Sequence, residues 1–437
     1  MRFYEPVSAS SLLVCCLAVV GCGGKSGPLD ESTKSGESAL SAGCAKLDNK
    51  NKPVFFSGTV GPEDAPRGGE PAECQTVACD KFTLDINLPP GTFNNPNKPG
   101  GVIVGIRFFN ANNTLNLFVY KGATLVGHSA GIIATAEGVF LSEPSNGQYT
   151  IWIAADPSYN LDPSVPYEAY ASVEYKPKTT PVRAVPPDLE FRAPRNLRFA
   201  HPSMPLFEED PPADSTCFNT ERDQDGAQLC LRFDQVIANI GDGPLEVREA
   251  IPHDPNDTAL NAFQRLYSSD GSFVMQPAGD FEYHAAHHHY HYKSLAQSYL
   301  WQSNSAGKKL GTAPLRSTLK RSFCIADIEI DRWGKDGVGP RTYFAPDCLV
   351  PLASDANFDY LIVGMTAGWA DVYDWFLPGQ YIETKGIADG YYILESCADP
   401  DARLTESNEA NNCIRTLIRL GNMSATFPTA ETIRNVP

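Results

Sequence analysis

Hydrophobic and polar residues alternate with a period of two along much of the chain. The clearest runs cover residues 82–88, 115–119 and 149–153. Alternation of this kind, interrupted by Pro, Gly and Asn, is typical of half-buried antiparallel strands. Several such strands at short spacing predict a β-sandwich over residues 46–176.

The second half of the chain has the same character. A Pro-rich joint at residues 176–181 is stiff and poor in sheet hydrogen bonds, so it predicts a boundary between domains. Beyond it, residues 182–421 again contain short apolar runs separated by turns, whereas residues 422–437 form a tail that we expect to fray. The sequence therefore predicts an all-β chain of two domains. The first resembles the jelly-roll-like β-sandwiches of the pre-peptidase C-terminal type.

The amino terminus has the features of an export signal. An apolar run at residues 12–20 is too short to span a bilayer and predicts a signal peptide over residues 1–21. The sequence Val-Val-Gly-Cys that ends at Cys22 resembles the bacterial lipobox, in which the Cys is lipidated. Gly23 then favours the outer membrane of a Gram-negative cell, although an ordinary cleaved signal with an incidental Cys is the alternative. Residues 22–45 are expected to form a flexible tether.

Composition narrows the choice of partner. The formal net charge is −17, which argues against nucleic acid because phosphate binding needs a basic face. An acidic surface suits cationic substrates such as amines, and it would equally serve solubility. Twelve cysteines in an exported chain predict disulfides, which persist outside the cytoplasm. Their spacing suggests the local pairs Cys74–Cys79, Cys217–Cys230, Cys324–Cys348 and Cys397–Cys413, with Cys44 left over in the tether.

Five of the eight histidines lie within residues 284–291. If this aromatic-rich segment is extended, His287, His289 and His291 project from one face and converge on a volume that suits one metal ion. If it is helical, the shared face carries His284, His287, His288 and His291 instead. Imidazole suits copper, zinc, iron or nickel. A solvated His-rich loop or a purely structural metal site would also account for the run.

The segment from Glu282 to Tyr292 resembles the copper-binding motif of the lysyl oxidase family, which makes His287, His289 and His291 the copper ligands. The segment Lys-Arg-Ser-Phe-Cys that begins at Lys320 is similar to the family's Lys-Ala-Ser-Phe-Cys, whose Lys donates its amine to the cofactor. The segment Asp-Val-Tyr that ends at Tyr373 is similar to the family's Asp-Thr-Tyr, whose Tyr becomes the quinone ring. The three matches follow the family's order and spacing.

The resemblance implies a β-rich catalytic domain with copper and a lysine tyrosylquinone built from Lys320 and Tyr373. The implied reaction is oxidative deamination of a primary amine or peptidyl lysine by molecular oxygen, which yields aldehyde, ammonia and hydrogen peroxide. The sequence does not identify the proton-abstracting base: Asp371 is near Tyr373 in the sequence, but a strand neighbour two residues away can as well be a structural hydrogen-bonding group. The alternatives are a non-catalytic copper- or zinc-binding surface lipoprotein of the same fold and a zinc hydrolase. The hydrolase lacks a convincing acidic base near the histidines.

Residues 406–412 gather carboxylate and amide oxygens that suit a hard cation such as calcium. The segment resembles a calcium-binding loop of the lysyl oxidase family. By that resemblance the ligands are Asp188, the Leu189 carbonyl, Glu406, Asn408, Asn411 and Asn412. Asn408 replaces the family's Asp, and Ala286 replaces a family Cys beside the histidines. A polar hairpin loop closed by the Cys397–Cys413 disulfide is the alternative.

Overall fold

The computed structural model describes most of the chain from residue 43 onward, and the described residues belong to one compact unit, Ser38–Pro437. The described ranges are 43–61, 71–109, 113–131, 134–160, 164–176, 181–202, 213–249, 259–284, 289–344 and 361–437. The predicted signal peptide, Cys22 and most of the predicted tether and joint therefore lie outside the described residues. No helix in the described ranges is long and apolar enough to cross a membrane.

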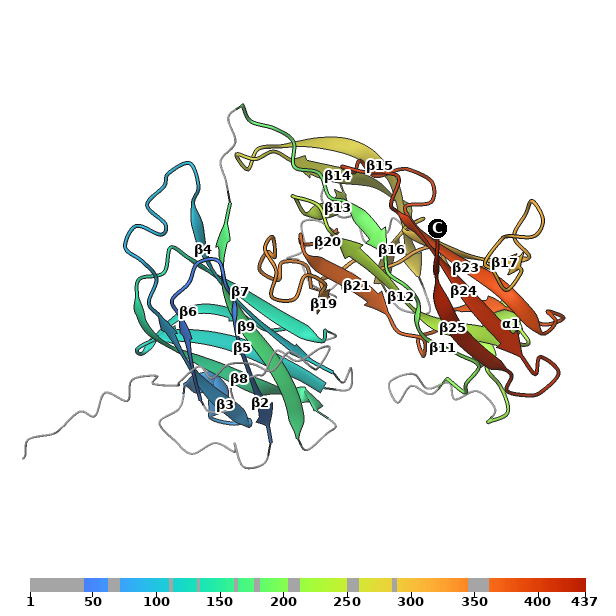
Figure 1. Ribbon diagram of the computed structural model, residues 1–437, viewed down its shortest axis with the longest axis horizontal. Helices are drawn as coiled ribbons and strands as arrows, with labels where there is room; N and C mark the ends of the chain where they lie inside the picture. The colour runs from blue at the N-terminus through green and yellow to red at the C-terminus, as the bar shows by residue number, and fades with distance from the viewer. Residues whose placement is uncertain are drawn as a thin grey trace, which may run out of the picture. The chain divides into compact units, whose positions relative to one another are not determined.

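The amino-terminal half is a β-sandwich, as the alternating pattern predicts (Figure 1). One sheet has the strand order β1 (Cys44–Leu47), β3 (Cys79–Ile86), β8 (Gly147–Asn160), β5 (Asn113–Lys121) and β6 (Thr124–Ser129). The other has the order β2 (Val54–Val60), β9 (Val165–Tyr175), β4 (Gly100–Phe108) and β7 (Ala136–Ser142). Apolar residues from both sheets form a shared core, in which the rings of Phe56 and Phe82 stack with centroids 3.7 Å apart.

The first described strand begins inside the segment that the sequence assigned to a tether. Strand β1 starts at Cys44 and pairs in parallel with β3, so residues 44 and 45, which the prediction placed in the tether, belong to a strand. Ala45 and Leu47 are buried, which explains why this short segment joins the sheet. The prediction that Cys44 is left over is also wrong, because Cys44 is disulfide-bonded.

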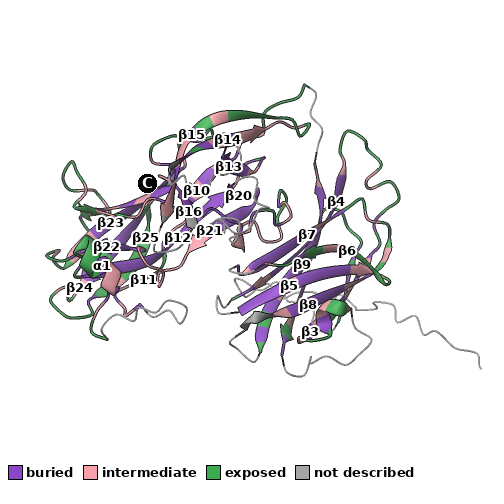
Figure 2. Cartoon of the chain, turned by 180° about the vertical axis from the view of Figure 1, so that it is seen from behind, coloured by how far each residue is buried: buried purple, intermediate pink, exposed green. Residues whose placement is uncertain are grey.

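The carboxy-terminal half is built from three sheets, with buried residues concentrated along their strands (Figure 2). The first contains β10 (Leu189–Phe191), β12 (Cys230–Asn239), β21 (Trp369–Tyr373) and β19 (Glu329–Ile330), and β11 (Arg195–Arg198) and β22 (Tyr381–Glu383) also pair with β12. The second has the order β16 (His289–Tyr292), β15 (Phe273–His284), β14 (Ala259–Tyr267), β13 (Leu245–Glu249) and β20 (Ile362–Met365).

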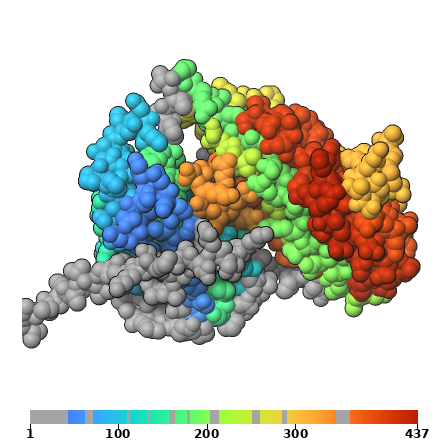
Figure 3. All heavy atoms as spheres, in the orientation of Figure 1, coloured from blue at the N-terminus to red at the C-terminus, as the bar shows by residue number. Residues whose placement is uncertain are grey.

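The third sheet has the order β18 (Arg316–Ser317), β17 (Ala296–Ser303), β23 (Gly390–Ala398), β24 (Cys413–Gly421) and β25 (Thr429–Val436). Strand β25 corrects the prediction of a frayed tail over residues 422–437. Its side chains are mostly exposed, and its atoms form part of the surface in the space-filling view (Figure 3). Backbone pairing with β24 holds it in place, and edge-strand pairing of this kind does not require apolar side chains. Apart from the 3-10 turn Ala72–Cys74, the described helical structure is α1 (Asn219–Asp225).

The two halves share apolar and main-chain contacts. Ile103 and Tyr170 from the sandwich belong to the same hydrophobic cluster as Ile330 and Trp369 from the carboxy-terminal half. The main chain is also shared, because Thr135 N donates to Ile328 O at 3.0 Å. Trp369 begins β21, so the core that includes the sandwich extends to the strand that ends at Tyr373.

Three of the suggested disulfides are present, namely Cys74–Cys79, Cys217–Cys230 and Cys397–Cys413. Cys324 is also disulfide-bonded, while its suggested partner Cys348 lies outside the described residues. The Cys397–Cys413 bond joins residues that face each other on β23 and β24, so it closes the loop between those strands.

Candidate active site

Lys320 and Tyr373 lie far apart in the sequence and close together in the structure. The Nζ atom of Lys320 is 4.9 Å from the centroid of the Tyr373 ring and 5.3 Å from that of Phe323. Tyr373 is the last residue of β21, which lies between β12 and β19 in the sheet. Tyr373 pairs with Gln235 on β12. The structure therefore places an amine beside the face of a tyrosine ring.

The Tyr373 ring is fixed by the segment that follows Lys320. Its hydroxyl donates to Cys324 O at 3.0 Å and accepts from Cys324 N at 2.7 Å. The Phe323 ring meets it edge-on, with centroids 4.7 Å apart and an interplanar angle of 77°. Burial raises the pKa of Tyr373 well above its usual value, and the nearby Asp371 carboxylate adds to this shift. A raised pKa favours the neutral phenol.

Burial has the opposite effect on the amine. It lowers the pKa of Lys320 to about 8, although the carboxylates of Asp371 and Glu221 act to raise it. An amine is nucleophilic only when it is neutral, and desolvation is a common way for proteins to activate lysine. Lys320 therefore has the environment of a reactive residue and not that of an ordinary surface lysine.

Asp371 lies two residues before Tyr373 on β21 and is almost completely buried. Its carboxyl group is hydrogen-bonded by the backbone of Val372 and Ala326, and burial raises its pKa well above the usual value. Its Oδ2 atom has no hydrogen-bond partner in the described part of the chain. Asp371 therefore accepts structural hydrogen bonds from the backbone, while its Oδ2 atom accepts none from the described residues.

Part of the histidine segment forms a strand near this site. Residues His289–Tyr292 form β16, which pairs with the end of β15 so that His291 faces Glu282 and His289 faces His284. The extended interpretation therefore holds over this stretch, and the helical one does not. His289 and His291 stand two positions apart in this strand, and the His291 side chain is fully buried. His287 and His288 lie outside the described residues.

A backbone bridge connects this strand to the lysine segment. Tyr292 N donates to Phe323 O at 2.9 Å, and Phe323 N donates to Tyr292 O at 3.0 Å. His291 is next to Tyr292, and Phe323 is next to Cys324, whose main chain holds the Tyr373 hydroxyl. The structure thus brings the histidine, lysine and tyrosine motifs close together. His291 is adjacent in sequence to a residue of the backbone bridge, and the other residue of the bridge, Phe323, belongs to the segment that begins at Lys320 and contacts Tyr373.

Most of the predicted calcium ligands are also brought together. Asn411 Nδ2 donates to Asp188 Oδ1 at 2.7 Å, and Asn412 Nδ2 donates to Glu406 Oε1 at 2.7 Å. The buried Oδ1 atoms of Asn411 and Asn412 have no hydrogen-bond partner among the described residues, which is how amide oxygens would be left by a missing cation. Asn408 differs, because its Oδ1 is used to accept from Ala410 N at 3.1 Å within the exposed loop.

Two acidic residues that were not predicted as ligands, Asp399 and the loop residue Glu409, lie close to Glu406. Ligand atoms of Asp399, Glu406 and Glu409 lie within 4.8 Å of one another. Leu189, whose carbonyl is one of the predicted ligands, donates its N–H to Glu406. This hydrogen bond connects the first residue of β10 to the loop. Asp399 follows Cys397 by two residues at the end of β23, and only the folded hairpin shows that it returns toward Glu406.

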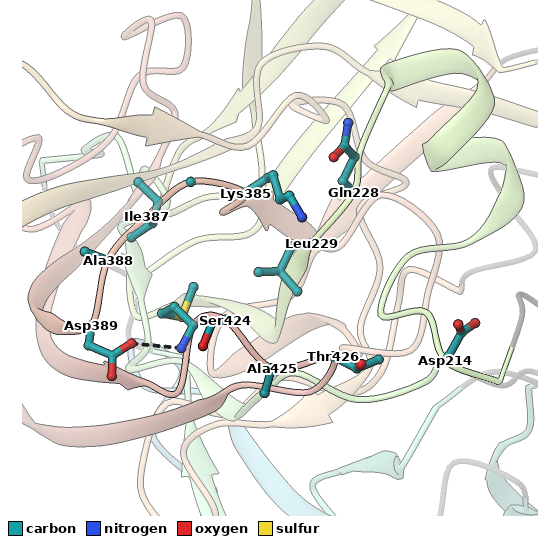
Figure 4. A pocket seen from close by; sticks show the side chains of 12 residues that line it. Asp214, Gln228, Leu229, Lys385, Ile387, Ala388, Asp389, Ser424, Ala425 and Thr426 are labelled. Atoms are coloured by element: carbon teal, nitrogen blue, oxygen red, sulfur yellow. Dashed lines mark hydrogen bonds between the residues drawn. The ribbon is translucent and has the colours of Figure 1, made fainter.

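A separate pocket lies away from these residues, between the turn at residues 385–389 and residues 423–426 (Figure 4). The close-up shows Lys385, Asp389 and Ser424 along its wall. Asp389 accepts backbone hydrogen bonds from Asn422 and Met423, at 3.0 and 2.8 Å, so its carboxylate is already used to hold the turn. None of the predicted site residues lines this pocket.

The fold and site define an all-β protein with a lysine–tyrosine pair bridged to a histidine-bearing strand. Residues 256–428 match the family model described as lysyl oxidase. Lysyl oxidase homolog 3B of Danio rerio is 29% identical over 133 residues, which are 30% of this chain and 14% of that protein. The matched region contains the histidine run, Lys320, Tyr373 and the loop at residues 406–412, and this part of the chain is therefore lysyl-oxidase-like.

Among solved structures, the chain is similar to the pre-peptidase C-terminal domain of a collagenase from Bacillus anthracis. That similarity has 10% identity and a TM-score of 0.18, and it covers 32% of this chain and 100% of that domain. A TM-score this low carries no weight for the arrangement of the sandwich, which rests on the sheets described above.

Proposed function

We propose that this protein is a copper-dependent amine oxidase whose quinone cofactor is made from Tyr373 and Lys320. The observation that supports the proposal most directly is the position of Lys320 Nζ, 4.9 Å from the Tyr373 ring centroid. A half-buried lysine of lowered pKa beside a half-buried tyrosine is unusual for a purely structural pair, because desolvation of an amine without a close ion-pair partner costs stability.

The residues present fit formation of the cofactor. Dioxygen would leave one oxygen atom on the Tyr373 ring, and its other atom would depart as water with two hydrogens from the ring and its hydroxyl. A bond from Lys320 Nζ to a ring carbon would then replace one N–H and one ring C–H. A second dioxygen would carry away those two hydrogens as hydrogen peroxide. The lowered pKa of Lys320 favours the neutral amine that this addition requires.

The donor set also fits copper. His289 and His291 stand two positions apart in β16, and His287 stands two positions before His289 in the sequence, outside the described residues. In an extended chain three such side chains would project from one face. Imidazole nitrogen suits copper, and Cu(II) when bound would supply one-electron exchange between a tyrosinate and dioxygen. The contribution of the chain is to bring the histidine strand beside Phe323 and Cys324, which hold the tyrosine.

Primary amines, including peptidyl lysine, are the proposed substrates. When formed, the quinone would accept two electrons from the amine, and dioxygen would take them up as hydrogen peroxide. Water would release the aldehyde and ammonia. Asp371 contributes a buried carboxyl oxygen without a hydrogen-bond partner among the described residues, and the net charge of −17 favours the approach of cationic substrates.

Attachment to the outer membrane through a lipidated Cys22 is part of the proposal. Detergent-phase partitioning of the wild type and a Cys22→Ala variant tests this attachment.

Peptide mass spectrometry after copper loading in air tests the central claim. We expect the wild type to contain a covalent link between the peptides that carry Lys320 and Tyr373, and to release peroxide with amines. Lys320→Ala and Tyr373→Phe should lose the link and the peroxide while retaining copper. Lys385→Ala and Tyr391→Phe are matched controls, because neither residue contacts the site, and both should behave as the wild type.

If the wild type binds copper but contains only unlinked, unmodified peptides and yields no peroxide, the proposal fails. The protein would then be a non-catalytic metal-binding member of the same fold. Bound zinc in place of copper, together with hydrolytic activity, would support the zinc hydrolase alternative.

A further inference from the structure

The loop that follows Tyr373, residues 374–380, is held by two buried charged residues from other parts of the fold. Arg232 on β12 donates from Nε to Trp375 O at 2.7 Å and from Nη2 to Leu377 O at 2.6 Å. Glu221 on α1 pairs with Arg232, at 2.7 Å between Oε2 and Nη1. Both side chains are almost inaccessible to solvent. A buried pair of this kind is costly to break, so the loop has a well-defined position.

Glu221 also reaches the part of the loop nearest to the lysine. Gly379 N donates to Glu221 Oε1 at 2.7 Å, so the pair fixes the loop at three points, Trp375, Leu377 and Gly379. The charge of Glu221 acts on Lys320 as well, since it opposes the lowering of the lysine pKa. The same carboxylate therefore holds the loop by a hydrogen bond and acts electrostatically on the amine.

Gly379 is in direct contact with the lysine chain. A Cβ atom at this position would lie 2.8 Å from Lys320 Cδ, 3.4 Å from its Cβ and 3.6 Å from its Cγ. The φ angle of Gly379 is +80°, which favours glycine. Any side chain here would push the aliphatic part of Lys320 away from its observed path, because Lys320 is the neighbour that such a Cβ meets.

We propose that this clamped loop positions Lys320 for its bond to Tyr373, with Gly379 as the surface that defines the path of the lysine chain. The role rests on the proposed function, because it concerns formation of the same cofactor. A lysine side chain has many rotamers, and confining it near the ring replaces a search with a prepared contact. Gly379, Arg232 and Glu221 act through Lys320 and are positioning residues.

The test compares two glycines. Gly379→Ala and Gly386→Ala both place an alanine at a φ angle near +80°, but no atom lies within 4 Å of a Cβ at Gly386. Each protein is loaded with copper in air, and the peptides that carry Tyr373 are sorted into unmodified, ring-oxidised but unlinked, and linked to Lys320. Copper content and thermal unfolding are measured alongside. The ring-oxidised, unlinked peptide is the readout that a general loss of structure would not increase.

We expect Gly386→Ala to link as the wild type does. In Gly379→Ala the Tyr373 ring should still be oxidised, whereas the linked fraction should fall by an order of magnitude or more, since a misplacement of about 1 Å can cost about 100-fold. Equal linking in the Gly379 and Gly386 variants would overturn the role of the loop.

A second variant covers the case in which Gly379→Ala does not fold. Gly379→Asn tolerates positive φ better than alanine but places the same Cβ against Lys320, so it should also accumulate the unlinked, oxidised peptide. Normal linking in this variant would equally overturn the role. A wild type without any link contradicts the proposed function itself, and this outcome is distinct from a linked wild type with a linked Gly379 variant.

Discussion

At Lys320, burial and two carboxylates act on the amine in opposite directions. Burial lowers the pKa of Lys320 to about 8, and Asp371 and Glu221 limit that decrease. Since Lys320 must be neutral to attack the oxidised ring, its reactivity depends on pH in a range that experiments can reach. The protonated fraction falls as the pH rises, so the attack accelerates with pH and levels off above the pKa.

The first prediction follows from that sign. The ratio of linked to ring-oxidised, unlinked Tyr373 at early times should rise through pH 8 and then reach a plateau. Asp371→Asn removes a charge that raises the pKa of Lys320, so the rise should move to lower pH. Quenched samples analysed by peptide mass spectrometry give the ratio directly. A ratio that is the same on both sides of pH 8 would contradict the predicted state of the amine.

Single residues show where sequence reasoning succeeds and where it stops. Lys320 and Tyr373 can be paired from short motifs, since their neighbours Phe323, Cys324 and Asp371 carry the resemblance. Gly379, Glu221 and Arg232 carry no such signal. An acid on a short helix and an arginine on a strand become a pair only when the fold brings them together. Burial could not be predicted either, because it depends on the contacts of the complete core.

Among the elements, β16 is the one whose conformation the sequence left open. Alternation favoured a strand, and the helical alternative remained because aromatic and histidine residues are compatible with both. The hairpin with β15 and the bridge from Tyr292 to Phe323 decide the matter through long-range hydrogen bonds. Strand β25 illustrates the opposite error, since its polar side chains concealed an edge strand that is held by backbone pairing with β24.

The strand conformation of β16 gives a prediction about copper. His289→Ala should lower the copper content of purified protein to well under half of the wild-type value, because the middle of three alternating ligands is lost. His128→Ala is the matched control, since His128 is an exposed residue of β6 in the sandwich and should have no effect on copper. Elemental analysis measures both. Full copper content in the His289 variant would mean that the metal is bound elsewhere.

The loop between β23 and β24 gives a prediction about calcium. Calcium should raise the thermal unfolding midpoint of the wild type, because the Oδ1 atoms of Asn411 and Asn412 are buried without partners and a bound cation would satisfy them. Asn412→Ala should abolish the calcium-dependent increase. Asn408→Ala should preserve it, because the Asn408 oxygen accepts from Ala410 N within the loop. Equal responses in the two variants, or none in the wild type, would favour a polar loop without a cation.

At the scale of the whole molecule, the two halves are linked by a buried ion pair as well as by apolar contacts. Arg341 Nη1 pairs with Glu137 on β7, and both side chains are fully buried. Arg341 Nε also donates to Asp327 O at 3.1 Å, and its main-chain N donates to Gly138 O at 3.2 Å. Asp327 in turn accepts from Thr366 N at 2.7 Å, just before β21. The sandwich thus contributes to the surroundings of the strand that carries Tyr373.

Breaking this pair from one side should be costly. Arg341→Met should lower the free energy of unfolding by about 3–5 kcal/mol, because it leaves the Glu137 carboxyl buried without its partner. Arg107→Met is the matched control, since its partner Glu168 is 43% exposed and such pairs contribute only about 0–1 kcal/mol. Urea unfolding followed by tryptophan fluorescence measures both. Similar losses in the two variants would contradict the structural role of the buried pair.

The cost of Arg341→Met should also depend on pH, with a sign that the carboxyl group determines. Burial raises the pKa of Glu137 to about 7, and Arg341 opposes this increase. Without Arg341 the folded-state pKa rises further, so the folded protein retains a proton that the unfolded chain releases above its ordinary pKa of 4.5. Stability is then greatest below that value and falls as the pH rises toward and past 7. The deficit of the variant should therefore be small in acid and large in base, whereas Arg341→Met combined with Glu137→Leu should lose this dependence. A deficit that is the same at all pH values would show that Glu137 is not the group left unpaired.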